Sequence, residues 1–432
     1  MADFSSRQPR SDTWRQIGAC IAALNSISEP ADLALNRWFR SNRSVGQRDR
    51  AVIMEFYYAY LKRRALIEAL ASSLPLESGG HARRYALAMQ KGVQSYNQPS
   101  DLSAAEQLWW QQSLSDFVKA RPDCVELTEH LPSWLFGSVR ASLGEVSAHR
   151  FAVNQLEMAP VDIRVNLSRI PFKRVLAELD LREIGYEILN PKLGAIRLAT
   201  RAAVKHLEGF AQGWFEVQDH GSQCIARAVA ARRGQTIVDF CAGAGGKSLA
   251  IADAMRGKGR VYALDTEHKR LLRLKERAHR AGFQSISTLV IEHEQDQGLA
   301  RLFGRADAVL VDAPCSGTGT LRRQPEIKWR LKPEELERLQ SQQLSILCSA
   351  ARLVRSGGFL VYATCSVLEQ ENTRVVELFL EQNSRFSSVS LPSDLLGSWG
   401  DEGPCVDAFQ GVQYWPHLHR NDGFYLVRFQ AD

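Results

Sequence analysis

Residues 309–317 read Val-Leu-Val-Asp-Ala-Pro-Cys-Ser-Gly, and the rest of the chain is organised around this stretch. Its apolar start, which ends at Val311, predicts a short buried strand that Pro314 terminates. Parallel strands of open α/β sheets place reactive groups just past their carboxyl ends. We therefore expect Asp312 and Cys315 to lie at a sheet edge where a ligand binds.

A second apolar strand, predicted over residues 358–363, also runs into a thiol, in Thr364-Cys365-Ser366. A single cysteine in such a place is usually a small buried apolar residue. Two strands that each bring a cysteine to one edge, beside the glycine loop described below, are hard to explain by packing. The pair therefore favours a reactive site.

Both strands belong to a regular alternation of strands and helices that begins at Thr236. This alternation predicts a doubly wound α/β sheet. The expected strands are 236–240, 260–265, 288–292, 306–311 and 359–364, and the expected helices are 247–255, 269–281, 333–354 and 370–380. Residues 395–420 look irregular, and 423–428 predict a late strand, antiparallel at the far side of the sheet.

A chain of 432 residues is too long for one core. Apolar residues at helical spacing, including Trp38, Phe56 and Tyr60, predict helices whose aromatic stripe forms a core. Alternation at period two from Val161 predicts a half-buried strand of a small α+β unit. The expected domains are helical over 1–145, α+β over 150–220 and α/β over 221–432.

The net charge of +6 is unevenly distributed along the chain. Residues 1–100 carry 14 Lys and Arg against 8 Asp and Glu, and the remainder balances. This excess fits either an RNA partner or a solvated helical surface. There is no apolar run near 18 residues, and the eight cysteines lack metal-ligand spacing. We expect a cytoplasmic monomer with reduced thiols, no metal and no membrane contact.

The sequence Asp239-Phe-Cys-Ala-Gly-Ala-Gly-Gly-Lys247 joins a predicted strand to a predicted helix. Its glycines permit a tight turn and a close approach to a ligand, and the helix start offers free N–H groups. Asp265 ends the next strand, where a carboxylate binds ribose hydroxyls. A dinucleotide or S-adenosylmethionine fits this pattern, and the paired thiols favour group transfer and hence S-adenosylmethionine.

Asp312-Ala-Pro-Cys-Ser-Gly317, Tyr362-Ala-Thr-Cys-Ser366 and the glycine loop resemble the RNA 5-methylcytosine methyltransferases of the Nop/Sun group. Leu321-Arg-Arg-Gln-Pro-Glu-Ile-Lys-Trp329 and Asp422-Gly-Phe-Tyr425 are similar to the bacterial members that modify 16S ribosomal RNA. The resemblance implies a Rossmann-like methyltransferase domain, an RRM-like subdomain before it and a NusB-like RNA-binding helical domain.

The resemblance also implies residue roles. Cys365 is then the nucleophile and Cys315 assists product release. The implied S-adenosylmethionine contacts come from Cys241, Ala242, Gly243, Ala244, Gly245, Gly246, Lys247, Asp265 and Asp312. Two positions depart from the family pattern: Ala244 stands where proline is usual, and Glu292 stands near the usual place of an adenine-side aspartate.

The chemistry explains why such a site needs a thiolate. Carbon 5 of cytosine is a poor nucleophile, and addition of a thiolate at carbon 6 moves electron density onto carbon 5. A free thiol with a pKa of about 8.5 is mostly protonated at neutral pH, so the site must favour the thiolate. Lys247 is a candidate for this role, and we expect Asp312 to hold the base at ring nitrogen 3.

A basic run follows the Cys315 loop. We expect RNA to contact Arg322, Arg323, Lys328, Trp329 and Arg330. Stacking of a base on Trp329 is worth about 1–3 kcal/mol where it occurs. The alternative is a solvated loop with Trp329 packed inward.

The expected activity is S-adenosylmethionine-dependent methylation of carbon 5 of a cytosine in 16S ribosomal RNA. The same chemistry on tRNA or another RNA is an alternative, as is a non-catalytic, RNA-binding ribosome-assembly factor. A DNA cytosine methyltransferase uses the Pro-Cys thiol, here Cys315, as its nucleophile. The Thr-Cys-Ser motif speaks against that reading.

Overall fold

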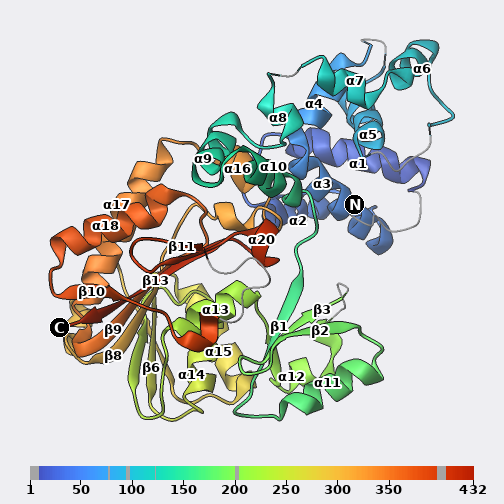
Figure 1. Ribbon diagram of the computed structural model, residues 1–432. Helices are drawn as coiled ribbons and strands as arrows, with labels where there is room; N and C mark the ends of the chain where they lie inside the picture. The colour runs from blue at the N-terminus through green and yellow to red at the C-terminus, as the bar shows by residue number, and fades with distance from the viewer. Residues whose placement is uncertain (1–8, 76–77, 94–97, 122, 200–203, 397–404) are drawn as a thin grey trace. The chain divides into compact units, whose positions relative to one another are not determined.

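The computed structural model describes residues 9–75, 78–93, 98–121, 123–199, 204–396 and 405–432 (Figure 1). The chain forms two compact units, and each contains two separate stretches of sequence. The first unit consists of Met1–Met158 and Thr320–Pro333, and the second of Ala159–Gly319 and Glu334–Asp432. The helical unit thus extends beyond the expected boundary at residue 145 and takes in a segment that we expected in the α/β domain.

Ten helices of the first stretch and one short helix of the second form the described part of the helical unit. They are α1 (Ser11–Leu24), α2 (Ala31–Ser41), α3 (Gln47–Lys62), α4 (Arg64–Ser73), α5 (His81–Gly92), α6 (Ala104–Gln111), α7 (Leu114–Lys119), α8 (Val125–Thr128), α9 (Ser133–Leu143), α10 (Glu145–Asn154) and α16 (Ile327–Arg330). The predicted aromatic stripe, with Trp38, Phe56 and Tyr60, is buried in their core. Helices α1 and α5 pack so closely at Gly18 that a Cβ there would lie 1.9 Å from the Ala82 carbonyl oxygen, so the contact requires glycine.

The second unit begins with a small α+β lobe. Its elements are β1 (Val161–Val165), α11 (Phe172–Leu181), β2 (Tyr186–Asn190), β3 (Ala195–Leu198), α12 (Glu208–Ala211) and β4 (Phe215–Val217). The strands pair antiparallel in the order β2-β3-β1-β4. This is a β-α-β-β-α-β unit whose sheet buries Ile163, Val165 and Ile196 against Val175 and Leu179 of α11.

A nine-stranded sheet forms the centre of the second unit. Its strands are β5 (Thr236–Asp239), β6 (Arg260–Asp265), β7 (Ile286–Val290), β8 (Ala306–Asp312), β9 (Val354–Thr364), β10 (Phe386–Val389), β11 (Cys405–Val406), β12 (Val412–Tyr414) and β13 (Phe424–Ala431). The order β11-β12-β13-β9-β8-β5-β6-β7 contains five adjacent parallel strands, from β9 to β7. The direction of winding reverses between β5 and β8, and such a switch point is where open α/β sheets bind ligands.

Helices cover both faces of this sheet (Figure 1). One face packs against α13 (His220–Ala228), α14 (Gly246–Ala254) and α15 (His268–Ala281), and the other against α17 (Glu335–Ala351) and α18 (Thr373–Gln382). Residues of β8 alternate between the two cores, with Leu310 on the first face and Val309 and Val311 on the second. The doubly wound α/β fold expected from the sequence is confirmed.

The end of the chain differs from the expectation. Within 395–420, the described residues include β11, β12 and α20 (Pro416–His419), and α19 (Ser393–Leu396) precedes them. The late strand β13 is antiparallel as expected, but it lies directly beside β9, with β12 and β11 beyond it. Strands of two or three residues are too short to show a period, so only tertiary pairing reveals them.

Candidate active site

The glycine loop between β5 and α14 is anchored to both neighbouring strands. Phe240 N–H donates to the Leu310 carbonyl of β8 at 2.8 Å, and Ala242 N–H donates to the Leu264 carbonyl of β6 at 2.8 Å. Gly245 has a φ of 86°, and a Cβ there would lie 2.3 Å from the Leu274 side chain. Only glycine therefore fits this turn without displacing α15.

Asp265, at the carboxyl end of β6, is buried beside this loop. One carboxylate oxygen accepts from Gly243 N–H and the other from Glu267 N–H, both at 2.8 Å. A carboxylate oxygen accepts more than one hydrogen bond. Asp265 therefore holds the glycine loop and retains acceptor capacity on the cavity that it lines.

A cavity of about 550 Å³ opens at the switch point, within the size range of small-ligand sites. Of the predicted cofactor residues, those that line it are Cys241, Ala242, Gly243, Ala244, Gly246, Lys247, Asp265 and Asp312. Gly245 does not line the cavity, and it faces Leu274 of α15. Glu292, the candidate substitute for an aspartate, also lines the cavity and is exposed. Lining residues that we did not expect include Thr266, Arg270, His293, Gln342 and Ile346.

Lys247 reaches from the start of α14 to the end of β8. Its Nζ lies 2.5 Å from Asp312 Oδ2, with both side chains mostly buried. Burial lowers the pKa of Lys247, but the charge and hydrogen bond of Asp312 outweigh this and raise the pKa above its usual value. Lys247 is therefore a fixed positive charge, and Asp312 is paired with it.

The two predicted cysteines lie side by side. Cys315 Sγ is 3.2 Å from Cys365 Sγ, and Cys365 N–H also donates to Cys315 Sγ at 3.3 Å. The parallel pairing of β8 and β9, which sets Asp312 opposite Ala363, brings the two loops together. The hydrogen bond with Cys365, together with burial, raises the pKa of Cys315 well above the usual thiol value. The raised pKa means that the Cys315 thiol keeps its proton at neutral pH.

Glu371 connects the residues that follow the two cysteines. Its side chain is fully buried. Oε1 accepts from Ser316 N–H at 2.8 Å and from Gln343 Nε2 at 2.9 Å, and Oε2 accepts from the hydroxyls of Ser316 and Ser366, both at 2.5 Å. One carboxylate thus joins the Cys315 loop, the Cys365 loop and helix α17.

Asn372 makes a second connection on the Cys365 side. Its side chain accepts from Thr364 Oγ1 at 2.6 Å and donates to the Ser366 carbonyl at 3.1 Å. The sequence analysis missed both Glu371 and Asn372, which lay at the start of an expected helix. The only signal in the sequence was that two polar residues stand six and seven positions after the candidate nucleophile Cys365. The burial that makes them part of the site cannot be predicted from the sequence.

The basic run of residues 322–330, which we expected to contact RNA, is partly buried. Lys328 is 1% exposed and donates to the carbonyls of Lys62 at 2.9 Å and His130 at 2.7 Å, all within the helical unit. The burial of Lys328 and its hydrogen bonds to these two carbonyls argue against the predicted contact with RNA. Trp329 Nε1 donates to the Leu61 carbonyl at 2.6 Å, which is the inward packing that we considered as the alternative.

The remaining members of the run differ in exposure. Arg322 is buried, Arg323 is partly exposed and Arg330 is exposed. RNA contact through Arg323 and Arg330 stays a prediction, and burial argues against Arg322.

The described residues lack two features. None of the helices they form has the length and apolarity needed to cross a membrane. Nor do they contain a group of three or more His, Cys, Asp or Glu side chains placed to hold a metal ion.

Comparison with known proteins shows what the chain is similar to. Residues 226–430 match the family described as 16S rRNA methyltransferase RsmB/F. The "Ribosomal RNA small subunit methyltransferase B" of Sodalis glossinidius is 34% identical over 300 residues, which are 69% of this chain and 65% of that protein. The "Probable ribosomal RNA small subunit methyltransferase B" of Synechocystis is 32% identical over 304 residues, 69% of this chain and 66% of that protein. The matches thus span just under two thirds of these relatives.

Two solved structures share the fold. The crystal structure of PH0851 superposes with a TM-score of 0.76 at 25% identity and covers 98% of this chain and 99% of that one. The structure of NSun6 from Pyrococcus horikoshii with SFG gives a TM-score of 0.62 at 19% identity and covers 70% of this chain and 99% of that one.

Proposed function

We propose that this protein, whose residues 226–430 match the family described as 16S rRNA methyltransferase RsmB/F, methylates carbon 5 of a cytosine in ribosomal RNA, with S-adenosylmethionine as methyl donor. The observation that carries the proposal is the pair of thiols, whose sulfurs are 3.2 Å apart. They lie at the same sheet edge as the 550 Å³ cavity, which Asp312 and Pro314 line. A thiol pair at a ligand-binding edge suits covalent catalysis on a ring that needs a nucleophile to enter and then leave.

The cavity fits S-adenosylmethionine. Gly243 and Gly246 line the cavity without a Cβ, helix α14 begins at Gly246, and Asp265 offers acceptors for ribose hydroxyls. The neighbouring NSun6 structure was solved with SFG, an analogue of this cofactor. When bound, the cofactor supplies an electrophilic methyl group. The chain's own residues then orient the base and manage its electrons and protons.

Cys365 is the proposed nucleophile. Its sulfur forms a bond to carbon 6, the carbon 5–carbon 6 double bond opens, and carbon 5 uses that electron pair to bond the methyl group. The Cys315 thiol, which keeps its proton, lies 3.2 Å from Cys365 Sγ and is within hydrogen-bonding distance of the proposed nucleophile. Lys247 adds a fixed positive charge in the same buried region.

Product release requires loss of the carbon 5 proton, return of the electron pair to the ring and cleavage of the sulfur–carbon 6 bond. We assign proton removal to Cys315. Once Cys365 is a thioether, it no longer forms the hydrogen bond that is the main cause of the raised pKa of Cys315. Cys315 then becomes a stronger acid and releases its own proton to solvent. The resulting thiolate takes the carbon 5 proton, and Cys365 leaves as a thiolate with the electrons of its bond to carbon 6.

The test uses two single variants and methyl transfer from labelled S-adenosylmethionine to small-subunit ribosomal RNA. Cys365→Ala should abolish transfer. Cys315→Ala should accumulate a covalent protein–RNA adduct, seen as a species that resists denaturing electrophoresis. Undiminished methylation by Cys365→Ala would contradict the proposal, and the reverse pattern would assign the nucleophile to Cys315. Bisulfite sequencing of the RNA product locates the methylated cytosine.

A further inference from the structure

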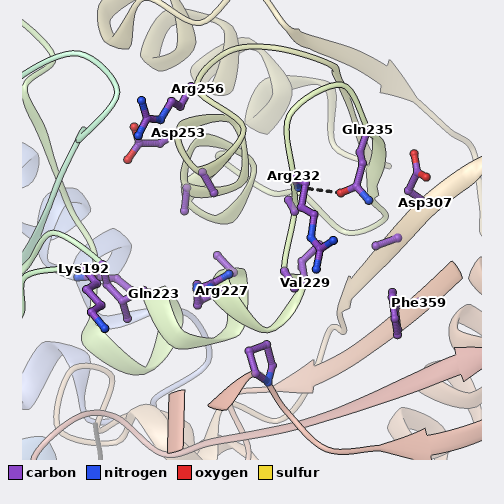
Figure 2. Close-up of a pocket in the computed structure, with 18 of the residues that line it drawn as sticks. Lys192, Gln223, Arg227, Val229, Arg232, Gln235, Asp253, Arg256, Asp307 and Phe359 are labelled. Atoms are coloured by element: carbon purple, nitrogen blue, oxygen red, sulfur yellow. Dashed lines mark hydrogen bonds between the residues drawn. The ribbon is translucent and has the colours of Figure 1, made fainter. Parts of the chain in front are cut away.

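A larger cavity, of about 1140 Å³, lies in the second unit away from the thiols. Its walls come from the small lobe, from the ends of α13 and α14 and from the start of three sheet strands (Figure 2). Gln235 immediately precedes β5, Asp307 is near the start of β8, and Phe359 lies in the first half of β9. The cavity is therefore at the amino edge of the parallel strands. Ala308 also lines the cavity and precedes Asp312 by four positions in β8, so at about 3.3 Å per residue roughly 13 Å of strand separates this cavity from Asp312.

The cavity wall is strongly basic. Its charged lining residues are Arg164, Lys192, Arg227, Arg232, Arg256, Arg355 and Arg428 against Asp253 and Asp307. The two acidic side chains are already engaged within the fold. Asp253 accepts from Arg164, Leu167 N–H and Ser168 N–H, and Asp307 accepts from Arg355 and Thr236 N–H. For Lys192, Arg232, Arg256 and Arg428, no ion pair with an acidic side chain is found among the residues that the structure describes.

Arg428 is a basic residue of this wall with an unsatisfied hydrogen-bond donor. It is half-buried, with its guanidinium 3.6 Å from the centre of the Phe359 ring. Its Nε is buried and has no hydrogen-bond partner among the described residues. Burial, and then the charges of Arg232 and Arg227, lower the pKa of Arg428. An anion bound between these arginines would relieve their repulsion and satisfy that donor.

Helix dipoles explain only part of this cluster. Arg227 is in the last turn of α13 and Arg256 follows the end of α14, and basic residues are favoured at helix C-termini. Arg232 is on a loop and Arg428 is on a strand, so neither has that role. In the view of Figure 2, Arg227 lies between Arg232 and Lys192, which comes from the β2–β3 hairpin.

We propose that this cavity binds the phosphodiester backbone of the RNA substrate, at a second contact distant from the reacting base. The inference rests on the proposed function, because it names a further binding site for the same substrate. Arginine forks bind phosphate oxygens in pairs, and a volume above the usual small-ligand range suits a chain of several phosphates rather than one. Phosphate contacts of this kind position a nucleic acid without reading its sequence.

The experiment compares neighbouring arginines. Arg232 lines the cavity, whereas Arg233 is exposed on the same loop and does not. Binding of a labelled fragment of small-subunit ribosomal RNA is measured over a range of salt concentrations for the wild type, Arg232→Gln, Lys192→Gln and Arg233→Gln. The first two variants should bind RNA several-fold more weakly, with the salt slope reduced by about 0.7 for each lost contact to single-stranded phosphate. Arg233→Gln should match the wild type.

Further measurements separate the possible failures. S-adenosylmethionine affinity should be unchanged in Arg232→Gln, because the cofactor cavity is at the opposite edge, whereas the RNA concentration that half-saturates methylation should rise. If Arg232→Gln and Lys192→Gln bind RNA as Arg233→Gln does, the inference is overturned, while methylation by the wild type still supports the proposed function. If inorganic phosphate binds in the millimolar range and Arg232→Gln loses only that binding, the site takes a small anion and the RNA assignment is overturned.

Discussion

The carboxylate of Glu371 accepts from four donors and ties together the two cysteine loops. Glu371→Gln keeps the size of the side chain but turns an amide donor towards these donors. A mismatch in a buried network costs about 1–3 kcal/mol. We expect a lower midpoint of thermal unfolding and a lower methylation rate, measured well below that midpoint.

Glu369→Gln is the matched control, since Glu369 is exposed and two residues away. A positioning role also predicts a change in the alkylation rates of Cys315 and Cys365 in folded Glu371→Gln, followed by peptide mass spectrometry. Unchanged alkylation rates of the two thiols would show that Glu371 stabilises the fold but does not position the cysteines.

The thiol pair makes a prediction about pH. The hydrogen bond with Cys365 is the main cause that raises the pKa of Cys315, and burial adds to it. A raised pKa favours the protonated thiol, so removal of the partner in Cys365→Ala should lower the pKa and increase the thiolate fraction at a given pH. Alkylation of the Cys315 peptide by iodoacetamide should therefore rise at a lower pH in Cys365→Ala than in the wild type. Coincident profiles would show that the two sulfurs do not interact.

Among the elements, the turn from β5 into α14 depends on one glycine. Gly245 combines a φ of 86° with a Cβ position 2.3 Å from Leu274 of α15. A non-glycine residue in this backbone region costs about 1–3 kcal/mol, and displacement of Leu274 adds to that. Gly245→Ala should therefore lower the free energy of unfolding and weaken S-adenosylmethionine binding, measured by urea denaturation and by calorimetric titration.

Gly246→Ala is the comparison for stability. Gly246 lacks a positive φ, and the nearest atom to a Cβ there is 3.8 Å away. At the first helical position alanine is acceptable, so stability should be preserved. Equal destabilisation by both substitutions would contradict the steric argument for Gly245.

At the scale of the whole chain, residues 320–333 leave the α/β unit and become part of the helical unit. Lys328 is the buried anchor of this segment. Burial, followed by the charges of Lys62 and Arg63, lowers the pKa of Lys328 well below its usual value. The unfolded chain, in which a lysine has a pKa of about 10.4, then binds more protons than the folded chain at pH values between the two pKa values.

The contribution of Lys328 to stability should therefore rise as pH increases through that window. Other groups titrate there too, so the useful quantity is the difference between the wild type and Lys328→Met. From pH 7 to pH 9 the free energy of unfolding, measured in urea, should shift in favour of the wild type relative to the variant. A constant difference would mean that Lys328 keeps an ordinary pKa in the folded protein.

The sequence by itself determined the α/β class, the glycine loop, Asp265 and the placement of two cysteines after two strands. These features are local, because the period of apolar residues, a positive-φ turn and a strand end are all written in a few consecutive positions. The alternation from Thr236 onward was therefore enough to predict that Asp312, Cys315 and Cys365 share one edge.

Only the tertiary structure decided which distant segments meet. The 3.2 Å contact of the thiols, the buried bridge through Glu371 and the burial of Lys328 each join residues that are separated in sequence or packed against another segment. The arginine cavity likewise collects side chains from a hairpin, a loop and a strand. Charge and burial depend on these long-range neighbours. The basic run at residues 322–330 therefore includes a lysine that binds buried carbonyls, whereas the arginines of the basic cavity are not consecutive in the sequence and could not be predicted as one site.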